Sequence, residues 1–168
     1  MSSHPQAVDA LSAQDATEIA DSLMGLLRAG GTLGSALQIT DQECEALYAL
    51  GYRMYEQGRY ADAMKVFAQL VAYNHLEPRY VMALGGAARM LGRHEEALQQ
   101  YVSAAVMTLD DPTPLYHSAE CLVGLGRLPE AAEALELAVS LCADGAHDTL
   151  KARASVLMQA IAVRINKA

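Results

Sequence analysis

The sequence of 168 residues has no tryptophan, a single phenylalanine, and only 12 Lys and Arg against 20 Asp and Glu. With a net charge of −8 it offers no basic face, so direct binding to nucleic acid is not expected. No apolar run approaches the roughly 18–20 residues of a membrane span. The segment from Met1 to Asp15 carries neither the basic start nor the apolar core of a signal peptide. We therefore expect a soluble intracellular protein that does not insert into membranes.

Residue patterns that support catalysis or metal binding are also missing. The three cysteines are too few and too widely spaced for a disulfide framework or a metal knuckle, and they suit a reducing compartment: Cys44, Cys121 and Cys142. The five histidines lack the spacing of a helical metal pair. The glycines at 30, 31 and 34 do not form a phosphate-binding frame. The sequence thus predicts no enzyme activity, no metal and no cofactor.

An internal repeat is present instead, and its units follow one another at a spacing of 34. Gly-Arg pairs recur at that interval, at 58–59, 92–93 and 126–127. The same offset relates small, bulky and further apolar positions, in the sets Ala63, Ala97, Ala131; Phe67, Tyr101, Leu135; and Leu70, Ala104, Ala138. A repeat of this length is typical of the tetratricopeptide repeat, which is a pair of antiparallel helices.

The residues of one unit explain why it folds as a helix pair. Leu47, Leu50 and Met54 place an apolar stripe on a first helix, and Gly58 allows the turn that follows. Pro78 suits the first turn of the next unit, where a missing N–H is tolerated. The predicted fold is all-α, an α-solenoid of three tandem tetratricopeptide repeats at 44–77, 78–111 and 112–145.

Helices are also expected on both sides of the repeats. Residues 1–11 are predicted to form a mobile tail, and residues 12–43 an amino-terminal helix with its linker. That helix has a Ser12 to Asp15 capping box, ends near Gly30-Gly31, and has an amphipathic stripe suited to dimerisation: Ile19, Leu23 and Leu26. A capping box from Thr40 to Glu43 starts the repeats. Residues 146–168 form a predicted capping helix with the stripe Ala154, Leu157, Ile161 and Ile165.

Three tyrosines on the first repeat helix are candidate binding residues. Tyr48, Tyr52 and Tyr55 lie at i, i+4 and i+7, so they project from one face, apart from the stripe that packs the helix pair. Two placements are compatible with this spacing. In one, the rings line the concave groove of the array, where a phenol combines an apolar face with a polar tip. In the other, they pack against the amino-terminal helix.

The same face continues along the array with mostly apolar residues. In the second repeat it presents Met82, Gly86 and Arg89, and in the third Tyr116 and Glu120. Gly86 leaves a gap in the wall, and methionine adapts to varied ligands. This composition suits an extended peptide with spaced hydrophobic anchors, because about seven extended residues match the length of a helix wall.

Several segments resemble one family in particular. The stretch Leu47-Tyr48-Ala49-Leu50-Gly51-Tyr52, followed by Gly58-Arg59-Tyr60, is similar to the first repeat of the class II translocator chaperones of bacterial type III secretion, the SycD/LcrH type. Gly30-Gly31-Thr32-Leu33 and His117-Ser118-Ala119-Glu120-Cys121-Leu122 extend the resemblance, which runs from about residue 17 to 145. Pro78 and His94 depart from the family pattern.

The resemblance implies a function. Such chaperones hold hydrophobic translocators soluble and export-competent in the bacterial cytoplasm, with an extended client segment in the concave groove. By motif match, Tyr48, Tyr52, Tyr55 and Tyr60 are expected to contact the client, with Tyr73 and Met82 beside them. The resemblance also implies a homodimer formed through the amino-terminal helix, and assistance to a transcription activator in some members.

Two other functions are compatible with an array of tetratricopeptide repeats. A co-chaperone that grips a carboxyl-terminal peptide needs an inward clamp of Lys, Asn and Arg, whereas the inward positions here include Tyr48, Tyr52, Ala83, Thr113 and His117. A generic tetratricopeptide adaptor in some other assembly is the remaining alternative. The two differ from a translocator chaperone in the partner that each would bind.

Overall fold

The computed structural model describes residues 13–142 and 145–166, and every regular element within these ranges is a helix. The all-α prediction is confirmed. In chain order the helices are α1 (Ala13–Arg28), α2 (Leu33–Ala36), α3 (Asp41–Glu56), α4 (Tyr60–Tyr73), α5 (Pro78–Met90), α6 (His94–Met107), α7 (Thr113–Gly124), α8 (Leu128–Leu141) and α9 (Asp148–Ile165). Across the described part of the chain, no helix is long and apolar enough to span a membrane.

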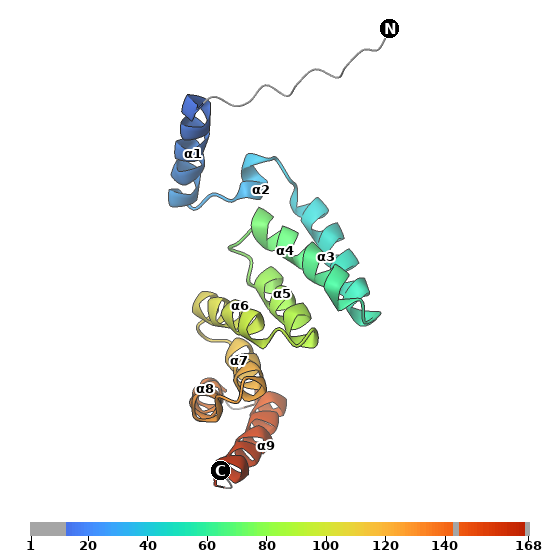
Figure 1. Cartoon of the computed structure of the whole chain (residues 1–168), viewed down its shortest axis with the longest axis vertical. Helices are drawn as coiled ribbons and strands as arrows, with labels where there is room; N and C mark the ends of the chain where they lie inside the picture. The colour runs from blue at the N-terminus through green and yellow to red at the C-terminus, as the bar shows by residue number, and fades with distance from the viewer. Residues whose placement is uncertain (1–12, 143–144, 167–168) are drawn as a thin grey trace.

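Three helix pairs form the body of the molecule. Pairs α3/α4, α5/α6 and α7/α8 follow one another in a curved stack, with α9 against the last pair (Figure 1). The turn within each pair contains a glycine at positive φ: Gly58 at 74°, Gly92 at 73° and Gly126 at 75°. Residues with a Cβ rarely adopt this conformation, which explains why glycine recurs once in every repeat.

The repeated small and bulky residues form the core of the stack. The alanines at 63, 97 and 131 are fully buried, and so are Phe67, Tyr101 and Leu135 one turn later. Close helix approach is visible at Gly51 of α3, where an added Cβ would lie 2.6 Å from Cε1 of Phe67. Leu50 was expected in the packing stripe, but it is exposed, because α3 turns Gly51 rather than Leu50 toward α4.

The arginine of each Gly-Arg pair has a local partner. Arg59, Arg93 and Arg127 each precede a second helix and pair with an acid at i+3: Asp62, Glu96 and Glu130. These acids also recur with the period of the repeat. Exposed pairs of this kind contribute little each, about 0.2–1 kcal/mol, so their main effect is local, at the start of α4, α6 and α8.

The start of the repeats follows the capping prediction. Thr40 accepts a hydrogen bond from the backbone N–H of Glu43, and the Glu43 carboxylate accepts one from the N–H of Thr40 at 2.8 Å. This box starts α3 at Asp41, slightly ahead of the expected repeat boundary at Cys44. Ile39, next to the box, packs against the core cluster that contains Cys44.

The amino-terminal helix stands apart from the stack. Helix α1 lies beyond the end of the array formed by α3 and α4, and α2 connects it to that end (Figure 1). It ends before Gly30, which has a φ of 78°. Ile19 and Leu23 are exposed and Leu26 is half-buried, so the apolar face of α1 has little cover within the chain. The predicted mobile tail at 1–11 and the capping box at Ser12 lie outside the described residues.

The carboxyl-terminal helix covers the end of the core. Ala154 and Ile161 of α9 are fully buried and Leu157 is half-buried against the last repeat. Ile165 was expected in the same stripe, but it is exposed at the last residue of α9, beyond the reach of α7 and α8. Helix α9 therefore caps the stack with its earlier turns.

Candidate peptide-binding groove

The first helices of the pairs form one side of an apolar groove with a volume of about 570 Å³. Two of its lining residues, Phe67 and Tyr101, come from second helices and lie at its floor. The remaining lining residues belong to α3, α5 and α7 or to the loops before α5 and α7: Tyr48, Tyr52, Tyr55, Glu77, Pro78, Arg79, Met82, Ala83, Gly86, Arg89, Thr108, Asp111 and His117.

Tyr48 has two roles in the structure. Its ring lies 5.9 Å from the ring of Phe67 and 5.7 Å from that of Tyr80, and it packs on the core cluster of the first repeat. The expectation that the α3 tyrosines are not needed to hold the repeat together is therefore wrong for Tyr48, because its neighbours are core residues. Its remaining surface lines the groove, and burial raises the pKa of its phenol.

Tyr52 and Tyr55 provide the more accessible part of the α3 wall. Tyr52 is 50% exposed and stacks on Tyr48 at 6.4 Å. Tyr55 is half-buried and meets the edge of Tyr60 at 5.1 Å. Burial raises the pKa of Tyr55, so its hydroxyl stays protonated at neutral pH and is able to donate a hydrogen bond. The wall thus combines apolar rings with polar tips.

Gly86 keeps the middle of the groove open. A Cβ added there would meet only ordinary contacts, 3.8 Å from the Tyr101 hydroxyl and 3.9 Å from the Tyr55 ring. At the neighbouring Gly85, a Cβ would lie 3.0 Å from the Tyr101 ring, so that glycine serves helix packing. The gap at Gly86 therefore belongs to the groove rather than to the core.

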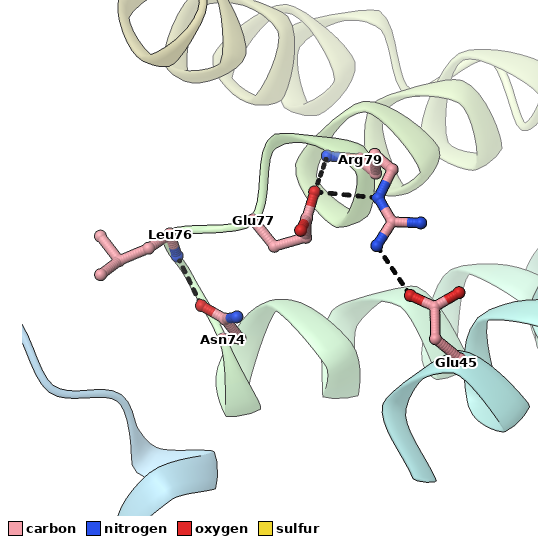
Figure 2. Close-up of polar contacts among 5 residues, drawn as sticks. All are labelled: Glu45, Asn74, Leu76, Glu77 and Arg79. Carbon is pink, nitrogen blue, oxygen red and sulfur yellow. Dashed lines mark hydrogen bonds and ion pairs between the residues drawn. The ribbon is translucent and has the colours of Figure 1, made fainter. Parts of the chain in front are cut away.

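Arg79 closes one end of the groove with a set of ion pairs (Figure 2). Its guanidinium bonds Glu45 of α3 at 2.7 Å and Glu77 at 3.0 Å, and both partners raise the pKa of Arg79. The same group lies 5.6 Å from the centre of the Tyr48 ring, within cation–π range. The loop before it is held by Asn74, whose side chain accepts from the N–H of Leu76. Arg79 thus joins two repeats beside the tyrosine wall.

A second set of charges lies at the other end. Glu120 of α7 pairs with His117 at 2.7 Å, with Arg89 of α5 at 3.5 Å and with Arg153 of α9 at 3.9 Å. Burial acts to raise the pKa of Glu120, but the hydrogen bond from His117 and the two arginines outweigh it, and the pKa is lowered. Glu120 is therefore ionised at neutral pH and links three helices.

Arg89 carries a donor that the fold leaves unused. Its Nε is buried and, within the described part of the chain, has no hydrogen-bond partner. The Arg89 side chain lines the groove next to Tyr101. Burial raises the pKa of Tyr101 to about 12. An unpaired buried N–H costs stability.

The structure separates the predicted site residues into two sets. Six of them line the groove: Tyr48, Tyr52, Tyr55, Met82, Gly86 and Arg89. The other four do not: Tyr116 and Glu120, which were expected on the same face, and Tyr60 and Tyr73, which were expected to contact the client by motif match. Contact of these four residues with a client stays a prediction. Tyr60 lies behind Tyr55, and Glu120 sits in the charge cluster.

Tyr73 and Tyr116 have their own places away from the groove. Tyr73 is at the end of α4, where its backbone approaches Gly34 of α2 and its hydroxyl meets Gln69. Tyr116 is buried against the last repeat, with its ring 4.8 Å beneath the Arg153 guanidinium. Neither residue lines the groove, so the groove gives no support to a client contact for Tyr73 or Tyr116.

Some groove residues were missed by the sequence reasoning. Tyr101 occupies the repeat position of Phe67, so the 34-residue repeat predicts a core residue there. The repeat does not predict that the Tyr101 hydroxyl faces the groove near Gly86. Arg79 was not predicted as a groove residue, although Glu45, its partner, lies one repeat period before it.

The cysteines have no features of a nucleophile. All three are buried free thiols, and burial raises the pKa of Cys121 to about 11 and also raises that of Cys44. A protonated, inaccessible thiol is a weak nucleophile. Their role in this fold is to pack.

The repeats match a known family, and so does most of the chain. The tetratricopeptide repeat family matches residues 48–114. Among curated proteins, the chain is 33% identical over 151 residues to the low calcium response locus protein H of Yersinia pestis, covering 89% of this chain and 90% of the relative.

Solved structures of two further proteins are similar. One is the type III secretion chaperone SycD of Yersinia enterocolitica in complex with a peptide of the translocator YopD, with 35% identity, a TM-score of 0.71, and coverage of 75% of this chain and 97% of that one. SycD has also been solved as an alternative dimer. The other is PcrH, from Pseudomonas aeruginosa, in complex with the chaperone-binding region of PopD, with 37% identity, a TM-score of 0.72, and coverage of 75% and 96%.

These likenesses extend well beyond a generic repeat. They cover most of each relative, at identities of 33–37%, and their structures superpose on the same helix stack. SycD is a chaperone by name, and PcrH was solved with the chaperone-binding region of PopD, which favours a chaperone over a generic adaptor. The chain belongs to the SycD/LcrH family of type III secretion translocator chaperones.

Proposed function

We propose that this protein binds an extended, apolar segment of a translocator in the groove between α3, α5 and α7, and keeps that translocator soluble until export. The proposal places the protein in the bacterial cytoplasm, where the client is made. The observation that carries it is the open groove itself, with the α3 tyrosines as one wall and a gap at Gly86.

The size and chemistry of the groove suit an extended segment with apolar anchors. Its residues come from three successive first helices, so it runs along the stack rather than into one pocket. Each buried anchor side chain contributes about 1.5–3 kcal/mol. Two or three anchors then give roughly micromolar binding after the ordering costs are subtracted.

Polar groups in the wall suit a peptide backbone. The Tyr55 hydroxyl is a donor on the groove wall, and the Arg89 guanidinium also lines the groove. An extended segment presents backbone carbonyls between its anchors, which these donors would satisfy. The complexes of SycD with a YopD peptide and of PcrH with a PopD region support a client of this type.

We also propose that the exposed face of α1 forms a homodimer. Ile19, Leu23 and Leu26 line a shallow apolar hollow together with Leu33 and Ala36 of α2. Exposed apolar patches on a helix outside the core commonly mark an interface. The alternative dimer of SycD supports a homodimer, and the choice of α1 rests on its exposed apolar face.

Two substitutions at one position test the binding proposal. Gly86→Leu fills the gap in the groove, and Gly86→Ala leaves it almost unchanged, because the added Cβ meets only ordinary contacts. We expect co-expression with full-length PopD to give soluble PopD with the native chain and with Gly86→Ala. The yield should fall at least tenfold with Gly86→Leu.

The comparison separates loss of binding from loss of fold. Both variants should keep the native melting temperature within a few degrees, since alanine and leucine are better helix formers than glycine. Equal soluble PopD with all three chains would contradict binding in the groove. Soluble PopD in the absence of any chaperone would remove the rationale for the function.

A further inference from the structure

A second apolar trough lies beyond the charge cluster. It has a volume of about 460 Å³ and is formed by Tyr116 of α7 and by one face of α9, at Ala152, Arg153, Val156, Leu157 and Ala160. Val156 is 67% exposed, and the small side chains of Ala152 and Ala160 one turn to each side leave room around it.

The linings of the groove and the trough are linked through one carboxylate, that of Glu120. Arg89 lines the groove and Arg153 lines the trough, and Glu120 pairs with both. On α7 the two sites are adjacent in sequence, because His117 lines the groove and Tyr116 lines the trough. The two sites therefore use side chains from the same turn of α7.

The repeat register places the trough on the same side of the stack. Tyr48, Met82 and Tyr116 are each separated by one period of the repeat, so they hold equivalent positions on the three first helices. The first two line the groove, and the third forms the inner wall of the trough. The same face of the array thus carries both sites.

We propose that the trough binds the part of the client that directly adjoins the segment in the groove. This inference rests on the proposed function and extends it: the client contacts the repeats first and α9 second. An apolar side chain of the client lies against Val156, between Ala152 and Ala160. A backbone carbonyl of the client accepts a hydrogen bond from Arg153. Arg153 is able to donate it because its pair with Glu120 is long, at 3.9 Å.

A second copy of this chain is a less suitable occupant. The exposed apolar face of α1 lies at the opposite end of the molecule from α9 (Figure 1). Val156 is the one large exposed apolar residue among the lining positions of the trough. An extended strand fits such a site, and it already lies next to it in the groove.

The test compares client lengths on matched variants of the full chain. The probes are the chaperone-binding region of PopD and two longer forms, extended by about ten PopD residues at either end, enough to span roughly 33 Å. The variants are Val156→Gln, in the trough, and Val163→Gln, which is similarly exposed on the same helix but outside the trough. Affinity is measured by isothermal titration calorimetry.

We expect one of the longer probes to bind the native chain about tenfold more tightly than the short one, the effect of burying one more aliphatic side chain. Val156→Gln should abolish this gain and leave the affinity for the short probe unchanged. Val163→Gln should behave like the native chain.

Three results would overturn the inference. One is equal affinity of the native chain for all three probes, and another is an equal loss with Val163→Gln. A third is a change in the sedimentation of the unliganded chain with Val156→Gln, which would identify an interface between copies. Failure of every probe to bind the native chain would instead contradict the proposed function, and the inference with it.

Discussion

At the scale of single residues, the tyrosines of α3 differ in what they contribute. Tyr52 is half exposed and stacks on another groove residue, Tyr48. Tyr48 packs between Phe67 and Tyr80, beneath the Arg79 guanidinium. Tyr52 therefore only lines the groove, whereas Tyr48 lines the groove and also packs in the core.

This difference predicts opposite effects of alanine substitution. Tyr52→Ala should weaken binding of the PopD chaperone-binding region about tenfold and lower the free energy of unfolding by less than about 0.5 kcal/mol. Tyr48→Ala should lower the free energy of unfolding by about 2 kcal/mol, because it opens a cavity beside Phe67. Urea denaturation and titration calorimetry measure the two quantities. Equal stability losses would mean that both rings are core residues.

The sequence predicts some of these roles and not others. The spacing of Tyr48, Tyr52 and Tyr55 places them on one face, and the structure agrees. No periodicity shows that Phe67 and Tyr80 bury Tyr48, because Tyr80 comes from the next repeat. Tyr116 shares the register of the groove residues, but Arg153 covers its ring, and α9 lies outside the register of the repeats.

At the scale of helices, the repeat predicts the packing within the three helix pairs. The contacts that it does not predict lie toward the ends of the stack. The glycine turns and alanine columns were predictable, since each follows from helix pairs at a fixed spacing. The Glu120 cluster was not, because it joins α5, α7 and α9 through side chains that no shared motif relates. Its charges add to the apolar contacts of Ala154 and Ile161, which pack α9 against the last repeat.

The cluster makes stability depend on pH in a defined direction. The folded pKa of Glu120 lies below its ordinary value of 4.5, so the unfolded chain takes up this proton first as the pH falls. The stabilisation is complete above that value and is lost as the pH falls through the folded pKa. The difference in melting temperature between the native chain and Glu120→Gln should therefore shrink from about pH 6 to about pH 3.

Glu136→Gln serves as the control for this measurement. Glu136 is exposed on α8, so its replacement should give a small difference that does not vary with pH. A difference for Glu120→Gln that stays constant across the same range would show that the carboxylate charge is not what stabilises the link between α5, α7 and α9.

Helix α1 gives a second prediction at this scale. Leu23→Asp places a charge in the middle of its exposed apolar face and should convert a dimer into a monomer in sedimentation velocity, because burying an unpaired carboxylate is costly. Val106→Asp, at an exposed position on α6, should leave the dimer intact. A dimer that survives Leu23→Asp would place its interface elsewhere.

At the scale of the whole molecule, the stack presents different surfaces for different contacts. The concave face carries the groove and the trough, and α1 extends from the opposite end to α9 (Figure 1). A dimer through α1 would thus leave both concave faces accessible to clients. The net charge of −8 helps to keep a complex with an apolar client dispersed.

The most direct test of the central claim is methyl NMR of the chain labelled at its eight methionines. Met82 lines the groove, and Met24 is exposed on α1, outside it. Addition of the PopD chaperone-binding region should shift the Met82 methyl resonance, assigned by Met82→Leu, and leave that of Met24 in place. A Met82 resonance that does not move at saturating PopD region would contradict binding of the client in this groove.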